Sequence, residues 1–241
     1  MSPARIPILT YHQIAEAPAK GAPYRSLYVA PAAFARQMGL LRLLGWRGLC
    51  MTALQPYLRG EKSGRVFGIT FDDGYRNNLL HALPVLQKNG FSATCYAVSS
   101  LLGHTNSWDL ALGIAQTPLM TADELRAWVA GAQEVGAHTR HHARLDRLSV
   151  ADSQDEIGGS KTELEALLGA PISHFCYPYG SYGAVQVAQV QAAGFATATT
   201  TARGRACSAS NLLELPRVPV LRSTTLPVFL LKLFSTYEDR K

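Results

Sequence analysis

The protein has 241 residues, of which 23 are Lys or Arg and 17 are Asp or Glu, giving a formal net charge of +6. Hydrophobic residues make up 47% and charged residues 17%, which excludes a disordered or low-complexity chain and leaves enough apolar side chains for a sizeable core. The length suits one large α/β domain, which we expect to span residues 1–241. No apolar run approaches the roughly 20 residues that cross a bilayer.

The N-terminal segment, the distribution of charge and the cysteine pattern indicate where the protein acts and which partners it can have. The segment MSPARIPILTYHQI lacks a basic region followed by an apolar run, so we expect a cytoplasmic protein, or an exported one whose leader is missing from this sequence. The positive charges are scattered rather than gathered in a stripe with aromatic residues, which argues against nucleic-acid binding. Four cysteines without a CxxC pair are expected to be buried free thiols.

Short β-rich segments alternate with amphipathic helical segments along the chain. The expected strands are 5–14, 65–73, 92–99, 134–139, 174–177, 195–200 and 215–220. The expected helices are 31–46, 77–89, 121–130, 149–168, 182–193 and a last one opened by Thr225. Segment 101–120 has no clear period and is expected to be a surface excursion. Seven strands joined by helix-length crossovers predict a parallel sheet with helices outside, as a barrel rather than an open doubly wound sheet.

Two adjacent carboxylates, Asp72 and Asp73, stand where an apolar strand ends in a glycine turn. Burying two such charges without compensation is costly, so a chain that places them there normally supplies a metal ion or an arginine. The alternative is a solvated turn that caps the next helix.

His138 and His142 are four residues apart, a spacing that in one helical turn puts both imidazoles on the same side, able to hold one ion. A chain with seven histidines contains such a pair by chance often enough that this spacing alone is weak evidence.

The ends of four expected strands carry polar or metal-binding residues. They are Asp72-Asp73, His138, segment 176–180 and Tyr11-His12, and in a parallel barrel the carboxyl ends of the strands meet at one rim. One carboxylate and two imidazoles, with a position left open for water, are typical of a hydrolytic metal site.

Three ordered segments, TFDDGY, HTRHH and FCYPYG, resemble the successive motifs of the polysaccharide deacetylase family (NodB homology domain, carbohydrate esterase family 4). The segments RIPILTYHQI and LPRVPV resemble the branch of that family that contains the poly-β-1,6-N-acetylglucosamine deacetylases. The resemblance covers residues from about 5 to 235. It implies a distorted (β/α)7 barrel, TIM-like and of the NodB homology fold, and a divalent metal, most often Zn²⁺, with Co²⁺ or Ni²⁺ as alternatives.

By position, the resemblance implies roles for individual residues. Asp73, His138 and His142 match the metal ligands, and Asp72 matches the general base. Tyr179 lies in the motif whose backbone amide helps to hold the oxyanion.

Two departures from the family pattern bear on the remaining roles. Cys176 stands where many members have an arginine that orients the base, and Arg217 is expected to replace that arginine. The chain has no late Leu-His-Asp motif, so the general-acid role falls to His12, with a core histidine bonded to a carbonyl as the alternative.

Other polar residues receive weaker expectations. His81 and His174 are expected to be structural. His104, in segment 101–120 with Trp108 and Asp109, is a candidate for the substrate side, with simple surface exposure as the alternative. Tyr177, Tyr179 and Tyr182 are expected near the rim, where they could pack on a sugar ring or only within the protein.

The function implied is a metal-dependent hydrolase that removes N-acetyl groups from the N-acetylated aminosugars of a polysaccharide or glycan. A deacetylase or deformylase of a small lipid- or nucleotide-linked aminosugar stays open, and the missing signal segment favours it. A non-catalytic saccharide-binding barrel and a redox iron enzyme with two histidines and one carboxylate are the alternatives from other classes.

Overall fold

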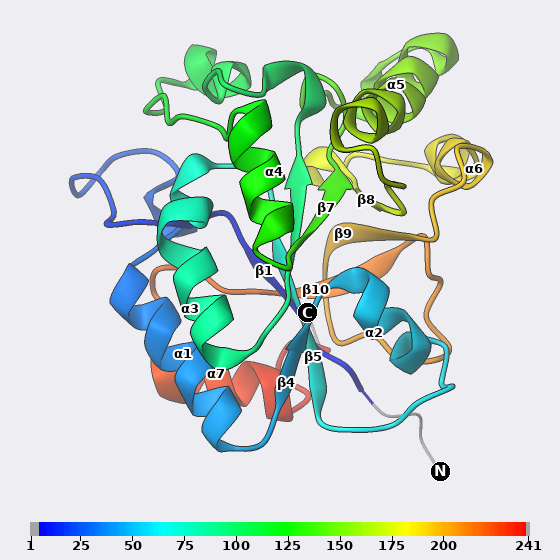
Figure 1. Ribbon diagram of the computed structural model, residues 1–241. Helices are drawn as coiled ribbons and strands as arrows, with labels where there is room; N and C mark the ends of the chain where they lie inside the picture. The colour runs from blue at the N-terminus through cyan, green and yellow to red at the C-terminus, as the bar shows by residue number, and fades with distance from the viewer. Residues whose placement is uncertain (1–4, 240–241) are drawn as a thin grey trace.

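The computed structural model describes residues 5–239, so the first four and last two residues of the expected 1–241 domain lie outside it. Seven parallel strands close into a barrel in the order β1–β10–β9–β8–β7–β6–β5, with β5 pairing back to β1 (Figure 1). This closure confirms the predicted (β/α)7 barrel. The strands are β1 (Ile8–Tyr11), β5 (Val66–Phe71), β6 (Thr94–Ala97), β7 (Glu134–Ala137), β8 (His174–Cys176), β9 (Thr197–Arg203) and β10 (Leu215–Pro219).

The expected helices surround the barrel as α1 (Pro31–Leu43), α3 (Leu83–Asn89), α4 (Ala122–Ala130), α5 (Val150–Leu168), α6 (Ala184–Ala192) and α7 (Leu226–Phe234) (Figure 1). Their ends follow local sequence chemistry. The Thr121 hydroxyl accepts from the Glu124 amide while the Glu124 carboxylate accepts from the Thr121 amide, and Gly90 and Gly169 end α3 and α5 in the left-handed conformation. No helix between residues 5 and 239 is long and apolar enough to cross a membrane.

Two elements between residues 44 and 64 were missed by the sequence analysis. Strand β4 (Arg47–Leu49) pairs with the first half of β5, and helix α2 (Met51–Leu58) follows it directly. The helix contains Pro56, and the carboxylate of Glu134 on β7 caps its first amides, 3.0 Å from the Met51 nitrogen. Elements this short, with a cap supplied from a distant strand, have no periodic signature.

Helix α2 closes the amino-terminal end of the barrel. Its apolar side chains Met51, Leu54 and Leu58 pack in one cluster with Ile8 of β1 and Leu215 of β10. A second, larger cluster fills the layer between the strands and the outer helices. The carboxyl end of the barrel is therefore the end left for a site. All four cysteines in the described chain are free, as expected. Three of them are buried, whereas Cys50, which was also expected to be buried, is partly exposed.

The expected strand 5–14 divides at His12 into β1 and a short β2 (Gln13–Ile14), which pairs outside the barrel with β3 (Tyr28–Val29). The expected helix 77–89 begins as a π-helical segment, η2 (Asn78–Ala82). Short 3₁₀ helices lie in other connections: η1 (Arg25–Leu27), η3 (Ser99–Leu101), η4 (Ser107–Leu112), η5 (Leu145–Arg147) and η6 (Pro178–Gly180).

Segment 101–120 is only in part the surface excursion that was expected. Leu110 and Leu112 are exposed, but Asn106 and Leu119 are buried. Leu119 forms an antiparallel bridge with Tyr75, two residues after Asp73. The segment therefore packs against the turn at the end of β5.

Candidate metal centre

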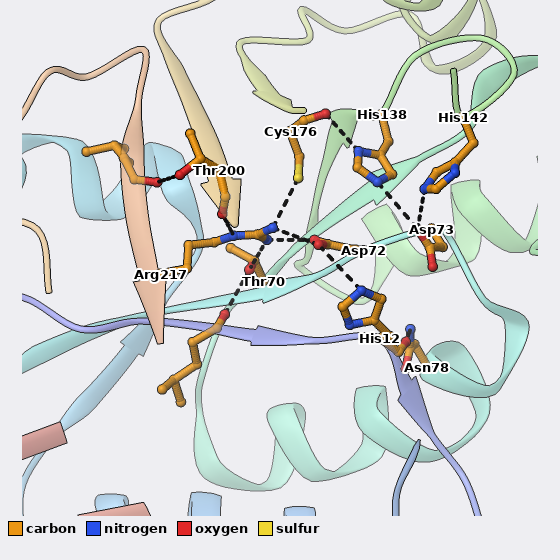
Figure 2. Close-up of polar contacts among 12 residues, drawn as sticks. His12, Thr70, Asp72, Asp73, Asn78, His138, His142, Cys176, Thr200 and Arg217 are labelled. Atoms are coloured by element: carbon orange, nitrogen blue, oxygen red, sulfur yellow. Dashed lines mark hydrogen bonds and ion pairs between the residues drawn. The ribbon is translucent and has the colours of Figure 1, made fainter. Parts of the chain in front are cut away.

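Asp72 and Asp73 follow the buried strand β5 and are themselves almost fully buried. Asp73 has a φ of 74° and Gly74 a φ of 77°, so the chain turns sharply through two left-handed residues. Figure 2 shows the result: the carboxylate of Asp72 points toward Arg217, and that of Asp73 points toward two histidines. Neighbouring residues of the same charge thus face different partners.

Asp73 meets both predicted imidazoles. Its Oδ1 atom lies 3.4 Å from Nε2 of His138 and 3.2 Å from Nε2 of His142 (Figure 2). The ligand atoms of the three residues all lie within 4.8 Å of one another, and all three residues are buried. The structure therefore brings together the three residues that were predicted to hold a metal.

The prediction that a helical turn aligns the two histidines is wrong. His138 comes directly after β7, and the loop that follows contains two left-handed residues, Thr139 with a φ of 65° and His142 with a φ of 59°. The carboxylate of Glu156 on α5 holds this loop by accepting hydrogen bonds from the amides of Arg140, at 2.9 Å, and His141, at 3.0 Å. The loop folds back on itself, which brings both imidazoles to one point.

The donor set fits a cation. Nδ1 of His138 lies 2.7 Å from the carbonyl oxygen of Cys176 and must donate to it, so in the neutral ring the Nε2 lone pair faces the Asp73 carboxylate. Two acceptors that face each other in a buried place require a proton or a metal ion between them. One carboxylate oxygen and two imidazole nitrogens suit Zn²⁺ and its divalent neighbours.

The pKa values of Asp73, His138 and His142 show how these three groups share protons when no cation lies between them. Burial would lower the pKa of His138, but the neighbouring Cys176 and Asp73 raise it well above its usual value. Burial holds the pKa of His142 below its usual value despite Asp73. Burial would raise the pKa of Asp73, but its hydrogen bonds to both histidines lower it well below the usual range. One imidazole therefore keeps a proton where a cation would fit.

Arg217 lies beside the other carboxylate. It reaches from β10 and makes two hydrogen bonds of 2.7 Å to the two oxygens of Asp72. Its remaining N–H groups donate to the carbonyl oxygen of Thr200, the hydroxyl of Thr70 and the sulfur of Cys176 (Figure 2). Burial would raise the pKa of Asp72, but Arg217 lowers it below its usual value. Arg217 thus lies directly against the carboxylate of Asp72.

His12 lies at the same rim, with its Nε2 atom 3.9 Å from Oδ2 of Asp72 and a quarter of its side chain exposed. The side chain of Asn78 fixes its backbone by donating to the His12 carbonyl at 2.8 Å and accepting from the Ile14 amide at 3.1 Å. With a quarter of its side chain exposed, the ring is not packed inside the core. Asn78 went unrecognised in the sequence, because a polar residue at a helix start has many ordinary explanations.

Tyr179 lies in the turn that follows β8, with a φ of 58°. The hydrogen bonds of that turn are donated by Gly180 and Ser181, so the Tyr179 amide is not used by them. Its ring lies edge-on to His142, with a centroid distance of 4.5 Å.

A cavity of about 270 Å³ opens over these residues. His12, both aspartates, both metal-facing histidines and Tyr179 line it, together with aromatic rings from the loops around it: Tyr24, Tyr28, Tyr75, Trp108 and Tyr177. Asp109 also lines it.

Four other residues with sequence-based expectations lie outside the cavity. Tyr182 and His104 do not line this cavity, so the expectation that they are substrate-side residues gains no support from the geometry. His81 is exposed on η2, and His174 is buried at the closed end, bonded to Thr52 and Thr197. Neither of these two histidines approaches the metal-facing cluster.

Residues 59–198, more than half of the chain, match the family model described as polysaccharide deacetylase. The chain belongs to the polysaccharide deacetylase family. This membership confirms the resemblance seen in the three sequence motifs and places the protein among hydrolases that act on carbon–nitrogen bonds.

The sequence and structural similarity to other proteins extends over nearly the whole chain. The Bacillus subtilis protein YxkH, whose name assigns it to the polysaccharide deacetylases, is 27% identical over 220 residues, which cover 90% of this chain and 72% of YxkH. The structure of a polysaccharide deacetylase from Bacillus cereus is similar with a TM-score of 0.80 and 28% identity, covering 96% of this chain and 69% of that one. The deacetylase PplD from Streptococcus pyogenes, in complex with acetate, shares the fold with a TM-score of 0.84, 24% identity and coverage of 96% and 99%.

Proposed function

We propose that this family member is a metal-dependent N-deacetylase, which removes acetyl groups from the N-acetylated aminosugars of a polysaccharide. The observation that carries the proposal is the convergence of Asp73, His138 and His142 on one point, with Asp72 beside them, at the floor of a single cavity. In this proposal the three residues hold a divalent cation, most often Zn²⁺. A cation held there supplies Lewis acidity, which makes water more acidic and polarises an amide carbonyl.

Asp72 acts as the general base in this proposal. Because Arg217 keeps the pKa of Asp72 low, its carboxylate is ionised at neutral pH and free to accept a proton from the attacking water. The two hydrogen bonds from Arg217 fix the plane of that carboxylate. A base held in one orientation lowers the entropic cost of reaching the transition state.

Amide hydrolysis also requires a donor to the developing oxyanion and a proton for the departing amine, and we assign these roles to the Tyr179 amide and the His12 ring. Tyr179 lines the cavity, and its N–H is outside the hydrogen bonds of its own turn, so in this proposal it donates to the developing oxyanion. His12, partly exposed to the cavity, gives a proton to the departing amine.

The cavity walls support a saccharide as the substrate. Sugar rings have apolar faces that pack on aromatic side chains, and Tyr24, Tyr28 and Trp108 supply such surfaces around the cavity. Asp109 supplies an acceptor for hydroxyl groups. Within the family, the N-terminal His12 segment and Arg217 favour the poly-β-1,6-N-acetylglucosamine branch.

The test is acetate release by the purified protein from chitooligosaccharides, β-1,6-linked N-acetylglucosamine oligomers and N-acetylated sugar nucleotides. We expect release from the oligomers, abolished by a chelator and restored by Zn²⁺ or Co²⁺. Asp73→Asn should abolish it, whereas the exposed His104→Asn, outside the cavity, should leave it unchanged.

The other outcomes decide among the alternatives. Release from sugar nucleotides alone would identify a small-molecule deacetylase. Glycan binding without acetate release would identify a non-catalytic barrel, and redox-active iron in the purified protein would identify an oxidoreductase. Chelator-resistant acetate release would refute the metal-dependent reaction.

A further inference from the structure

The two imidazoles of the candidate metal centre are held in different ways. A histidine that binds a metal through one ring nitrogen usually donates a hydrogen bond from the other, which fixes the orientation of the ring. His138 follows this rule through its 2.7 Å contact with the Cys176 carbonyl oxygen. His142 does not: its Nδ1 atom is buried and has no hydrogen-bond partner among residues 5–239. Because Nε2 faces Asp73 and the cation position, something other than a hydrogen bond from Nδ1 must hold the plane of this ring.

Aromatic side chains surround the His142 ring instead. Trp108 stacks on one face, with ring centroids 4.3 Å apart and planes 23° from parallel. Tyr179 meets the ring edge-on at 4.5 Å, and His138 meets it edge-on at 5.0 Å. The nearly parallel contact with Trp108 is the one that fixes the plane of the imidazole, because a flat partner at this distance leaves no room for the ring to tilt.

Trp108 is itself held firmly, although its segment showed no secondary-structure period. Asn106, two residues earlier, has no exposed surface, and its side-chain oxygen accepts from the Thr117 amide at 2.7 Å. Its amide nitrogen donates to the Asp109 carboxylate at 3.1 Å, so one buried side chain braces both ends of the loop around Trp108.

The same segment is tied to the turn that carries the carboxylate ligand. The Met120 amide donates to the Gly74 carbonyl at 2.9 Å, and the Arg76 amide donates to the Pro118 carbonyl at 3.0 Å. Segment 101–120 therefore touches two sides of the centre: its end fixes the turn after Asp73, and Trp108 covers His142.

We propose that Trp108 is the positioning residue of His142, and that its indole face orients the imidazole for the cation in place of a second hydrogen bond. The inference depends on the proposed metal site. It predicts that metal affinity depends on a flat aromatic side chain at position 108, because an aliphatic side chain presents no flat face to fix the ring plane.

The test measures Zn²⁺ affinity directly, by competition with a chromophoric chelator, and does not depend on turnover. Trp108→Leu should weaken Zn²⁺ binding by about 10- to 100-fold, as loss of an outer-shell partner does elsewhere, whereas Trp108→Phe should stay within about threefold of the unchanged protein. Leu110→Ala is the matched control, because this exposed leucine lies on the same segment and outside the cavity. A thermal melt of each variant shows whether the barrel is intact.

The outcomes separate this inference from the proposed function. Equal Zn²⁺ affinity in Trp108→Leu and the unchanged protein would overturn the role of Trp108 while leaving the metal site standing. Equal weakening by Leu and Phe would overturn the requirement for a flat ring. If the unchanged protein binds no Zn²⁺ at all, the proposed metal site fails, and this inference fails with it.

Discussion

The guanidinium of Arg217 and the carboxylate of Asp72 meet through two parallel hydrogen bonds of 2.7 Å, with both side chains almost fully buried. The pair joins β10 to the end of β5 across the barrel interior. Every N–H of this guanidinium has an acceptor in the protein, so the fork geometry is used in full. A lysine carries the same charge but lacks the fork.

Arg217→Lys should therefore reduce kcat/KM for acetate release by about 100-fold, because a small displacement of a catalytic group costs that much. The charge opposite Asp72 is kept, so folding should survive the change. Arg126→Lys, at an exposed ion pair with Asp123, is the control and should change nothing. Unaltered turnover in Arg217→Lys would show that Asp72 needs no orienting partner.

The pH profile of the same variant gives a second prediction. Asp72 can accept a proton only as a carboxylate, and Arg217 lowers its pKa against the opposing effect of burial. Weaker contacts from a lysine let that pKa rise, so the acid limb of kcat/KM should move to higher pH in Arg217→Lys. The limb would stay in place if a group other than Asp72 controlled it.

Zn²⁺ affinity should increase with pH. In the metal-free protein the pKa of His138 is raised well above its usual value, despite burial, by Cys176 and Asp73, so the ring carries a proton that the metal must displace. Titration calorimetry at several values between about pH 6 and 8, in buffers of different ionisation enthalpy, measures both the affinity and the released proton. Binding that is independent of pH and releases no proton would contradict this.

His12→Gln should lower kcat for acetate release by about 10²- to 10⁴-fold, the range for loss of a general acid, and leave Zn²⁺ affinity unchanged. Glutamine keeps a polar side chain near the 3.9 Å position beside Asp72 but has no proton to give. The control is His81→Gln, on the exposed side of η2. If His12→Gln keeps full turnover, the proton for the leaving amine comes from another group.

Glu238 anchors the C-terminal helix and gives a prediction about stability. Its fully buried carboxylate bonds Arg203 at 2.6 Å and Lys232 at 2.8 Å. Neutralising this carboxylate leaves the buried ammonium of Lys232 without its counter-charge, so Glu238→Gln should cost about 3 kcal/mol in urea unfolding. Asp123→Asn, at an exposed ion pair, should cost nothing measurable.

The pH dependence of that stability follows from the pKa of Glu238. Burial would raise this pKa, but Arg203 and Lys232 lower it below its usual value. The contribution is therefore present above the ordinary carboxyl pKa and is lost as the pH falls through the folded value. Unfolding of Glu238→Gln should accordingly depend less on pH in the acid range than that of the unchanged protein.

The sequence was sufficient to predict the barrel and the meeting of Asp73, His138 and His142, because both have local signals. Strand and helix periods are written in consecutive residues, and polar residues at strand ends must meet when parallel strands close. The route by which His138 and His142 meet could not be read. The four-residue spacing suggested a helical turn, whereas in the loop Thr139 and His142 adopt the left-handed conformation. That conformation is readily predicted only at glycine, so the sequence does not reveal it at a threonine or a histidine.

Segment 101–120 and Asn78 show the other limit of the sequence. The segment has no period because tertiary hydrogen bonds from Asn106 and bridges to the β5 turn hold it, rather than a repeating face. The side chain of Asn78 bonds the backbone of Ile14 and His12, which are 64 and 66 residues away in the sequence. Contacts of that range exist only once the barrel has closed.

Asp73, Thr139, His142 and Tyr179 are four of the six non-glycine residues in the described chain whose φ is positive. The left-handed backbone at each such residue costs roughly 1–3 kcal/mol of folding free energy, which contacts in the surrounding barrel must offset. Laboratory evolution that rewards heat resistance alone should relax these positions first, replacing them with glycine or asparagine. A thermostable variant obtained in that way would keep its barrel and lose its chemistry, so campaigns to harden this protein should hold the four positions constant.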